Sequence, residues 1–114
     1  MRVLVIGAGQ TGAKVIEQLR KNPAITVLTA DPRPEPKAVR DGLIERPDVT
    51  DVITPLTLAE VLDRTGADMA LLAMASEEMA LGTAPGVDVL ADALFDEISA
   101  ISTVPMIQVA RSAS

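Results

Sequence analysis

The sequence predicts a single α/β domain, residues 1–114, built on a doubly wound sheet of about five parallel strands in the order 3-2-1-4-5, with helices on both faces. Short runs rich in Val, Ile and Leu alternate with amphipathic stretches along the whole chain. A chain of 114 residues is also large enough for one domain with a real core, but short of a complete two-half dinucleotide-binding fold of the usual size. Because strands that alternate with helices are joined by right-handed crossovers, this alternation favours a parallel sheet covered on both sides.

The first half of the pattern is strand, helix, strand. Arg2 to Ile6 is a continuous apolar run of the kind found in a strand buried on both faces. From about Gln10 the apolar residues recur with a helical period, which ends at Asn22-Pro23. A second β-rich run, Ile25 to Ala30, leads into a loop with three prolines, Asp31 to Pro36.

The middle of the chain predicts two more helices around a third strand. Lys37 to Arg46 can form a short helix, Thr50 to Thr54 a strand, and Leu56 to Arg64 a helix. Thr57 stands three residues before Glu60, as in a capping box, so we expect their side chains to cap that helix.

The remaining elements follow Gly66, which ends the preceding helix. Asp68 to Ala75 is the most apolar stretch and predicts the central strand. After a Gly- and Pro-containing loop, Asp88 to Ser102 is amphipathic and predicts a helix, and Pro105 to Ala110 predicts a last strand.

Composition excludes several classes of function. The chain has no Cys and no His, which removes thiolate nucleophiles, imidazole bases and the usual zinc ligands. Its net charge is −6 with no Lys/Arg cluster, so we expect no nucleic acid partner. Phe95 is the single aromatic residue, so the core must be aliphatic.

The sequence also predicts a cytoplasmic, soluble protein. The longest apolar run, Met69 to Ala75, is far shorter than the roughly 18 residues that a membrane span requires. The N-terminal stretch lacks the length and the small-residue cleavage site of a signal peptide.

The stretch VLVIGAGQTG, Val3 to Gly12, carries the main functional signal. It has the spacing G-x-G-x-x-G directly after a predicted strand and before a predicted helix. In that context Gly7 makes the tight turn, Gly9 lets the backbone approach a pyrophosphate, and Gly12 lets the helix pack close to the strand. The helix N-terminus then offers unpaired N–H groups and the positive end of its dipole to the phosphates.

Asp31 completes this signal, because it lies nineteen residues after Gly12 at the end of the second predicted strand. A carboxylate there can accept two hydrogen bonds from an adenosine ribose and would repel a 2′-phosphate, which favours NAD or NADH over NADP. Two alternatives stay open: the glycines serve only a tight β-α turn, and Asp31 is a solvated loop acid. Arg33 is a further candidate, paired with a 2′-phosphate, with Glu35 or with nothing.

Three residues at the ends of later strands are also candidate ligand contacts. Thr54, Ala75 and Ser76 should lie at the same carboxyl edge of the sheet, where ligands of open α/β sheets bind. Ser76 equally suits a helix cap, with Glu77 and Glu78 behind it.

The segments MRVLVIGAGQTGAKVIEQL, TLAEVLDRTGADMALLAMASEE and PMIQVARS, with Asp31 between the first two, resemble the nucleotide-binding domain of regulators of potassium conductance, known as RCK, KTN or TrkA-N. The resemblance implies a Rossmann-like domain that binds NAD(H), ATP, ADP or a related ligand. It also implies a homodimer that controls a membrane ion channel or transporter without converting its ligand. The chain departs from the family at Ile53-Thr54-Pro55, where the family often has Gly-Asp.

Carried over by position, the resemblance assigns a phosphate loop and a ribose contact to this chain. The loop would consist of Gly7, Ala8, Gly9, Gln10, Thr11 and Gly12, and the ribose would bind Asp31. Since no second ligand-sensing domain follows Ser114, we expect either an excised domain or a stand-alone relative.

Three functions agree with these residues. The first is a non-catalytic regulatory module that binds NAD(H) or, alternatively, ATP, ADP or AMP. The second is the NAD-binding half of an oxidoreductase whose substrate domain is absent. Catalysis by this chain alone is disfavoured, because it has no His, Cys or Tyr to act as acid or base. The third is a dimerisation scaffold with an empty site.

Overall fold

The core of the protein is one parallel sheet. The computed structural model describes residues 1–33, 35–53, 56–73, 100 and 102–109. Within them the strand order is β2-β1-β3-β4, with β1 at Arg2–Ile6, β2 at Thr26–Ala30, β3 at Met69–Leu72 and β4 at Met106–Gln108. All three strand pairings are parallel, which confirms the predicted fold class.

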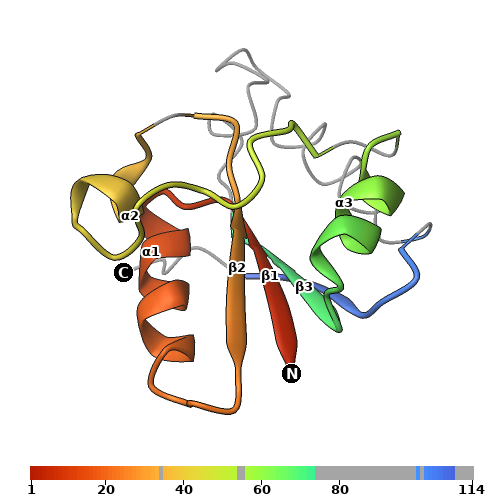
Figure 1. Cartoon of the computed structure of the whole chain (residues 1–114), viewed down its shortest axis with the longest axis horizontal. Helices are drawn as coiled ribbons and strands as arrows, with labels where there is room; N and C mark the ends of the chain where they lie inside the picture. The colour runs from red at the N-terminus through yellow and green to blue at the C-terminus, as the bar shows by residue number, and fades with distance from the viewer. Residues whose placement is uncertain (34, 54–55, 74–99, 101, 110–114) are drawn as a thin grey trace.

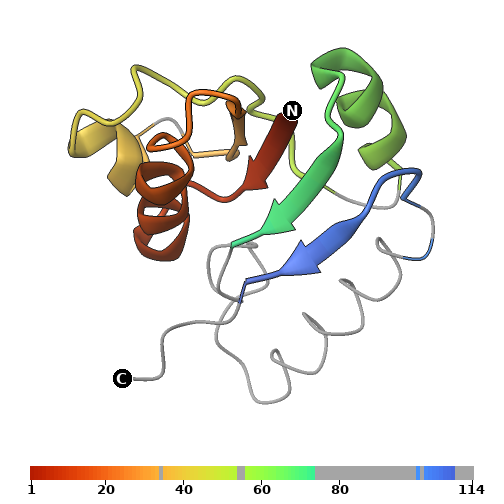
Figure 2. The same ribbon diagram turned by 90° about the horizontal axis from the view of Figure 1, so that it is seen from below.

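Helices cover both faces of this sheet, as predicted. Helix α1 (Gln10–Leu19) and the short α2 (Lys37–Arg40) lie on one side of the strands, and α3 (Leu58–Thr65) lies on the other (Figure 1). The view from below shows the same arrangement, with β4 beyond β3 (Figure 2). None of the helices in the described ranges combines the length and the apolarity needed to cross a bilayer.

Strand β1 supplies side chains to both cores, because successive side chains of a strand point to opposite faces. Leu4 and Ile6 pack with Leu58, Val61 and other residues in a cluster that we call the α3-side core. Val3 and Val5 pack in the α1-side core, which includes Ala13 and Ile16 of α1. The four apolar residues of β1 are at most 1% exposed, as the continuous apolar run predicted.

The prediction of a third strand at Thr50 to Thr54 is wrong: the described part of this segment, residues 50–53, forms no strand. A single parallel bridge, between Ala30 and Val49, takes its place beside β2. The chain then leaves the sheet edge because the next residues bond toward α3. Asp51 accepts a hydrogen bond from Arg64, and the Val52 carbonyl accepts one from the Thr57 hydroxyl.

The capping box at α3 is also wrong. The Thr57 hydroxyl donates to the Val52 carbonyl at 2.7 Å and makes no capping bond to the helix. Glu60 instead accepts a hydrogen bond from Arg64, one turn along the same helix. The predicted end at Gly66 is confirmed, since Gly66 adopts a left-handed φ of 63° there.

The helix predicted at Lys37 to Arg46 is shorter than expected, because α2 ends at Arg40 and Gly42 follows with a φ of 78°. The strands predicted at Asp68 to Ala75 and Pro105 to Ala110 are present as the shorter β3 and β4. Most of the helix predicted at Asp88 to Ser102 lies outside the described residues.

Candidate functional site

The turn after β1 has the backbone that its glycines predict. Gly7 has a φ of 104°, a conformation that residues with a side chain rarely adopt. Its N–H donates to the Ala30 carbonyl at 2.7 Å, so the turn starts beside the end of β2. The turn therefore lies at the carboxyl edge of the sheet, where ligands of open α/β sheets bind.

Gly12 holds α1 against this turn. A β-carbon at Gly12 would lie 1.8 Å from the Gly7 carbonyl oxygen and 2.6 Å from its carbon. Because both atoms belong to the backbone, no side-chain movement can relieve the overlap. Gly12 is therefore required for the close approach of helix and turn, which agrees with the role that the motif predicted.

The N-terminus of α1 suits an anion. Gly9 is its N-cap and has no side chain to cap the helix, and no acidic residue stands in the first turn. The N–H groups of Gln10, Thr11 and Gly12 have no acceptor inside the helix, and the helix dipole adds positive potential there. Such a terminus can bind a phosphate group without a lysine.

Asp31 is fully buried, with 0% of its side chain exposed, and is not the solvated loop acid of the alternative interpretation. Its Oδ2 accepts hydrogen bonds from the Ala8 N–H at 2.9 Å and from Arg33 Nη2 at 2.7 Å. Its Oδ1 accepts from the Arg33 N–H at 2.9 Å and from Arg33 Nε at 3.0 Å. The carboxylate thus joins the glycine turn to the loop after β2.

These contacts keep Asp31 ionised. Burial raises the pKa of Asp31. This effect is outweighed by hydrogen bonds from the Arg33 side chain and from the N–H groups of Ala8 and Arg33, together with the positive charge of Arg33. The pKa of Asp31 therefore lies below its ordinary value. A negative charge is therefore held beside the glycine turn.

Arg33 has a partner that the sequence interpretation did not include. Its guanidinium pairs with Asp31, a partner that is absent from the sequence-based alternatives of a 2′-phosphate, Glu35 or none. The signal was the two-residue spacing in Asp31-Pro32-Arg33, where the proline turns the chain so that the arginine folds back.

Ala8 joins the turn to two neighbouring segments, the loop after β2 and α2. Its N–H donates to Asp31, and its carbonyl accepts a hydrogen bond from the Ala38 N–H of α2 at 2.9 Å. Sequence reasoning placed Ala8 in the loop but did not find Ala38, because nothing in its side chain marks a backbone contact. Gly7, Ala8 and Gly9 are buried, Thr11 is half-buried and Gln10 is exposed. The candidates Thr54, Ala75 and Ser76 lie outside the described residues.

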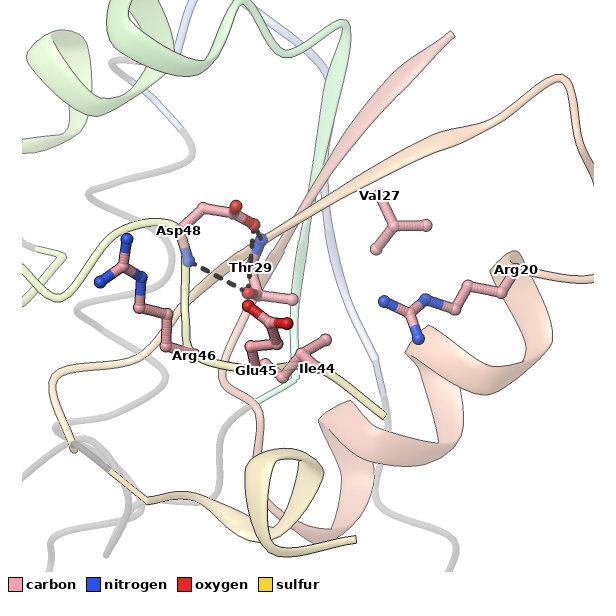
Figure 3. Close-up of a pocket in the computed structure, with 7 residues that line it drawn as sticks. All are labelled: Arg20, Val27, Thr29, Ile44, Glu45, Arg46 and Asp48. Carbon is pink, nitrogen blue, oxygen red and sulfur yellow. Dashed lines mark hydrogen bonds between the residues drawn. The ribbon is translucent and has the colours of Figure 1, made fainter. Parts of the chain in front are cut away.

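A separate hollow of about 290 Å³ lies beside β2, near the C-terminal end of α1 (Figure 3). It is lined by Arg20, Val27, Thr29, Ile44, Glu45, Arg46 and Asp48. Two basic and two acidic side chains balance in this lining, and it contains none of the glycine-turn residues.

Across the described ranges, no group of three or more His, Cys, Asp or Glu side chains is placed to hold a metal ion. The glycine turn with Asp31 is therefore the candidate site.

Neither a protein-family model nor a curated protein sequence matches this chain. Among solved structures, it is similar to the UDP-glucuronic acid 4-epimerase from Bacillus cereus in complex with NAD, with a TM-score of 0.55 and 21% identity. The match covers 98% of this chain and 40% of that chain, so this chain spans less than half the length of the epimerase. At this identity the likeness shows the fold, a Rossmann-like parallel sheet with helices.

Proposed function

We propose that the chain binds the adenosine and pyrophosphate of NAD or NADH, or of an adenine nucleotide such as ATP, ADP or AMP, at the carboxyl edge of its sheet. The hydrogen bond from the Ala8 N–H to Asp31 supports this most directly. It brings the two separate parts of the motif, the phosphate turn and the ribose acid, into one continuous site. A structural glycine turn alone needs no carboxylate buried beside it.

Each part of the site has a distinct role in this proposal. The N–H groups at the start of α1 would bind the pyrophosphate, and the absence of a side chain at Gly9 would let it approach the backbone. Asp31 would accept hydrogen bonds from the ribose hydroxyls. Thr54, Ala75 and Ser76, which lie outside the described residues, remain candidate contacts for the adenosine.

We propose further that binding is regulatory rather than catalytic. The resemblance to RCK, KTN and TrkA-N domains supports a cytoplasmic homodimer whose nucleotide occupancy is transmitted to an ion channel or transporter. The absence of His, Cys and Tyr from the sequence agrees with a module that does not convert its ligand.

A second candidate follows from the solved structure that the chain resembles. That structure is an NAD-bound epimerase of more than twice the length of this chain. On this alternative, the chain is the dinucleotide-binding part of an enzyme, and another segment or subunit supplies the substrate site. Both candidates use the same nucleotide contacts.

Calorimetric titration with NAD, NADH, ATP and ADP tests the shared site. We expect saturable binding to the wild type and loss of binding in Gly9→Val. Since Gly9 has a φ of −78°, a valine there meets no left-handed strain. Because Gly9 is buried, circular dichroism must show that the variant is folded before loss of binding is assigned to the phosphate. Ala59→Val, on an exposed position of α3, is the matched control and should bind normally.

An unchanged nucleotide affinity in Gly9→Val would refute the phosphate site. If the wild type bound no nucleotide, the result would favour the third function, a dimerisation scaffold with an empty site. Turnover separates the two roles. Loss of NADH absorbance with one of a panel of carbonyl substrates, or conversion of a sugar nucleotide without net loss of NADH, supports the enzyme part.

A further inference from the structure

The carboxylate of Asp31 has no acceptor capacity left in the structure. A carboxylate offers about four lone-pair sites on its two oxygens. Four donors occupy them: the N–H groups of Ala8 and Arg33, and Nε and Nη2 of Arg33. A ribose therefore cannot add its hydrogen bonds to Asp31 while all four remain.

The four donors divide evenly between backbone and side chain. Each oxygen accepts one hydrogen bond from a backbone N–H and one from the Arg33 guanidinium. If the guanidinium leaves, the two backbone bonds still orient the carboxylate. One acceptor site then opens on each oxygen, side by side.

Two adjacent acceptor sites are what a ribose diol requires. Its 2′ and 3′ hydroxyls present two neighbouring donors, as the guanidinium does with Nε and Nη2. We infer that the Arg33 guanidinium occupies the ribose-diol position on Asp31 and is displaced when a nucleotide with free 2′ and 3′ hydroxyls binds. Arg33 is thus an internal competitor that sets the affinity and the ribose specificity of the site. The inference rests on the proposed nucleotide binding.

The surroundings of the pair permit this exchange. The side chain of Arg33 is 41% exposed, whereas that of Asp31 is fully buried. The arginine can therefore turn toward solvent without opening the core, while the aspartate stays fixed. The displaced guanidinium remains two residues from Asp31, close enough to pair with a phosphate on the 2′ position.

This arrangement predicts how Arg33 affects different ligands. A ligand with a free diol competes with Arg33 and gains affinity when the arginine is removed. A ligand without the diol has no hydroxyls for the vacated sites, so it gains nothing. A 2′-phosphate pairs with the displaced guanidinium, so NADP loses affinity when Arg33 is removed.

The test is calorimetry on the wild type, Arg33→Met and Arg33→Lys with ADP, 2′,3′-dideoxy-ADP, NAD and NADP. In Arg33→Met we expect ADP and NAD to bind about fivefold more tightly, the order of a half-exposed bidentate ion pair. The affinity for 2′,3′-dideoxy-ADP should stay unchanged or fall. Arg33→Lys removes the two-pronged donor and keeps the charge, so the preference for ADP over its dideoxy analogue should also rise.

Arg64→Met is the matched control, since Arg64 also holds carboxylates, Asp51 and Glu60, but on α3. It removes the same charge and should leave the preference for ADP over its dideoxy analogue unchanged. Two results would overturn the inference and leave the proposed function intact. One is an equal affinity of the wild type and Arg33→Met for ADP, and the other is a gain in affinity for the dideoxy analogue equal to that for ADP. Failure of all variants to bind any of the four ligands would refute the proposed function itself.

Discussion

The main-chain N–H of Ala8 and the carboxylate of Asp31 are joined by a hydrogen bond of 2.9 Å, although 23 residues separate them along the chain. The bond crosses from the turn after β1 to the loop after β2, the two neighbouring strand ends at the carboxyl edge. It is buried, so the charge and the turn are held in one geometry before any ligand arrives.

Gly12→Ala should destabilise the fold strongly. Its added methyl group would overlap the Gly7 carbonyl, and relief requires α1 to move away from the turn. We expect a loss of about 3 kcal/mol in the free energy of unfolding, at the upper end for overpacking, measured by urea denaturation. Gly42→Ala is the control: Gly42 has a positive φ, unlike Gly12, but nothing lies within 4 Å of an added β-carbon, so the variant should lose only about 1 kcal/mol. Equal losses would show that Gly12 is not in contact with the turn.

The stability of the protein should depend on the ionisation of Asp31. Because its pKa is lower in the folded state than in the unfolded chain, the ionised form stabilises the fold at pH values above the ordinary pKa of 3.8. That contribution is lost as the pH falls below 3.8 through the folded-state pKa. We expect Asp31→Asn to be less stable than wild type at pH 7 and to lose less stability between pH 5 and pH 3, values chosen to bracket about 4. Denaturant titration at several pH values checks this.

Asp41→Asn is the control for that experiment, since Asp41 is exposed and pairs only with the half-exposed Lys37 among the described residues. Its stability at pH 7 should lie within about 0.5 kcal/mol of the wild type, as for other exposed substitutions. An Asp31→Asn profile parallel to the wild-type curve would contradict the stabilising role of the charge.

Asp31→Asn should also change ligand preference. An amide keeps one acceptor but loses the charge, so it accepts ribose hydroxyls less well and repels a 2′-phosphate less. We expect the affinity for NAD to fall about tenfold, the order of one charge-assisted hydrogen bond, and that for NADP to fall less. Calorimetry with both dinucleotides measures this, and equal losses would mean that Asp31 does not contact the ribose.

Leu58→Ala should show the contribution of the α3-side core. Leu58 is 1% exposed and packs among the aliphatic residues beneath α3, so its truncation should cost about 2–5 kcal/mol. Leu56→Ala, two residues earlier and 93% exposed, should change stability by less than about 0.5 kcal/mol. Thermal unfolding of both variants makes the comparison, and a small loss at Leu58 would mean that α3 does not pack on the sheet.

The sequence predicted the parts of the fold that local pattern determines. The apolar run Arg2 to Ile6 gave β1 with its observed bounds, and the glycine spacing gave the turn and the start of α1. The absence of a strand at Thr50 to Ile53 could not be predicted. These residues suit a strand, but Asp51 and Val52 accept hydrogen bonds from Arg64 and Thr57 instead. Such contacts join residues that no periodicity relates.

The candidate site could likewise be predicted only in part. The motif spacing placed Gly7, Gly12 and Asp31 correctly at the carboxyl edge. It did not reveal that Arg33 covers the carboxylate, because a loop with three prolines has no period from which side-chain direction can be read. The edge of β2 is a further example: Asp48 accepts the Thr29 N–H at 2.8 Å, a contact that depends on how the chain returns from α2.

The use of β1 by both cores has a consequence for synthesis on the ribosome. Once residues up to Ala30 have emerged, β1, α1 and β2 can pair and bury Val3 and Val5. Leu4 and Ile6 must wait for α3 and β3, which end at Leu72. At roughly 5–20 residues per second, the delay is about 2–8 seconds. During that interval the apolar face formed by Leu4 and Ile6 stays uncovered, because its partners in α3 and β3 have not yet been made.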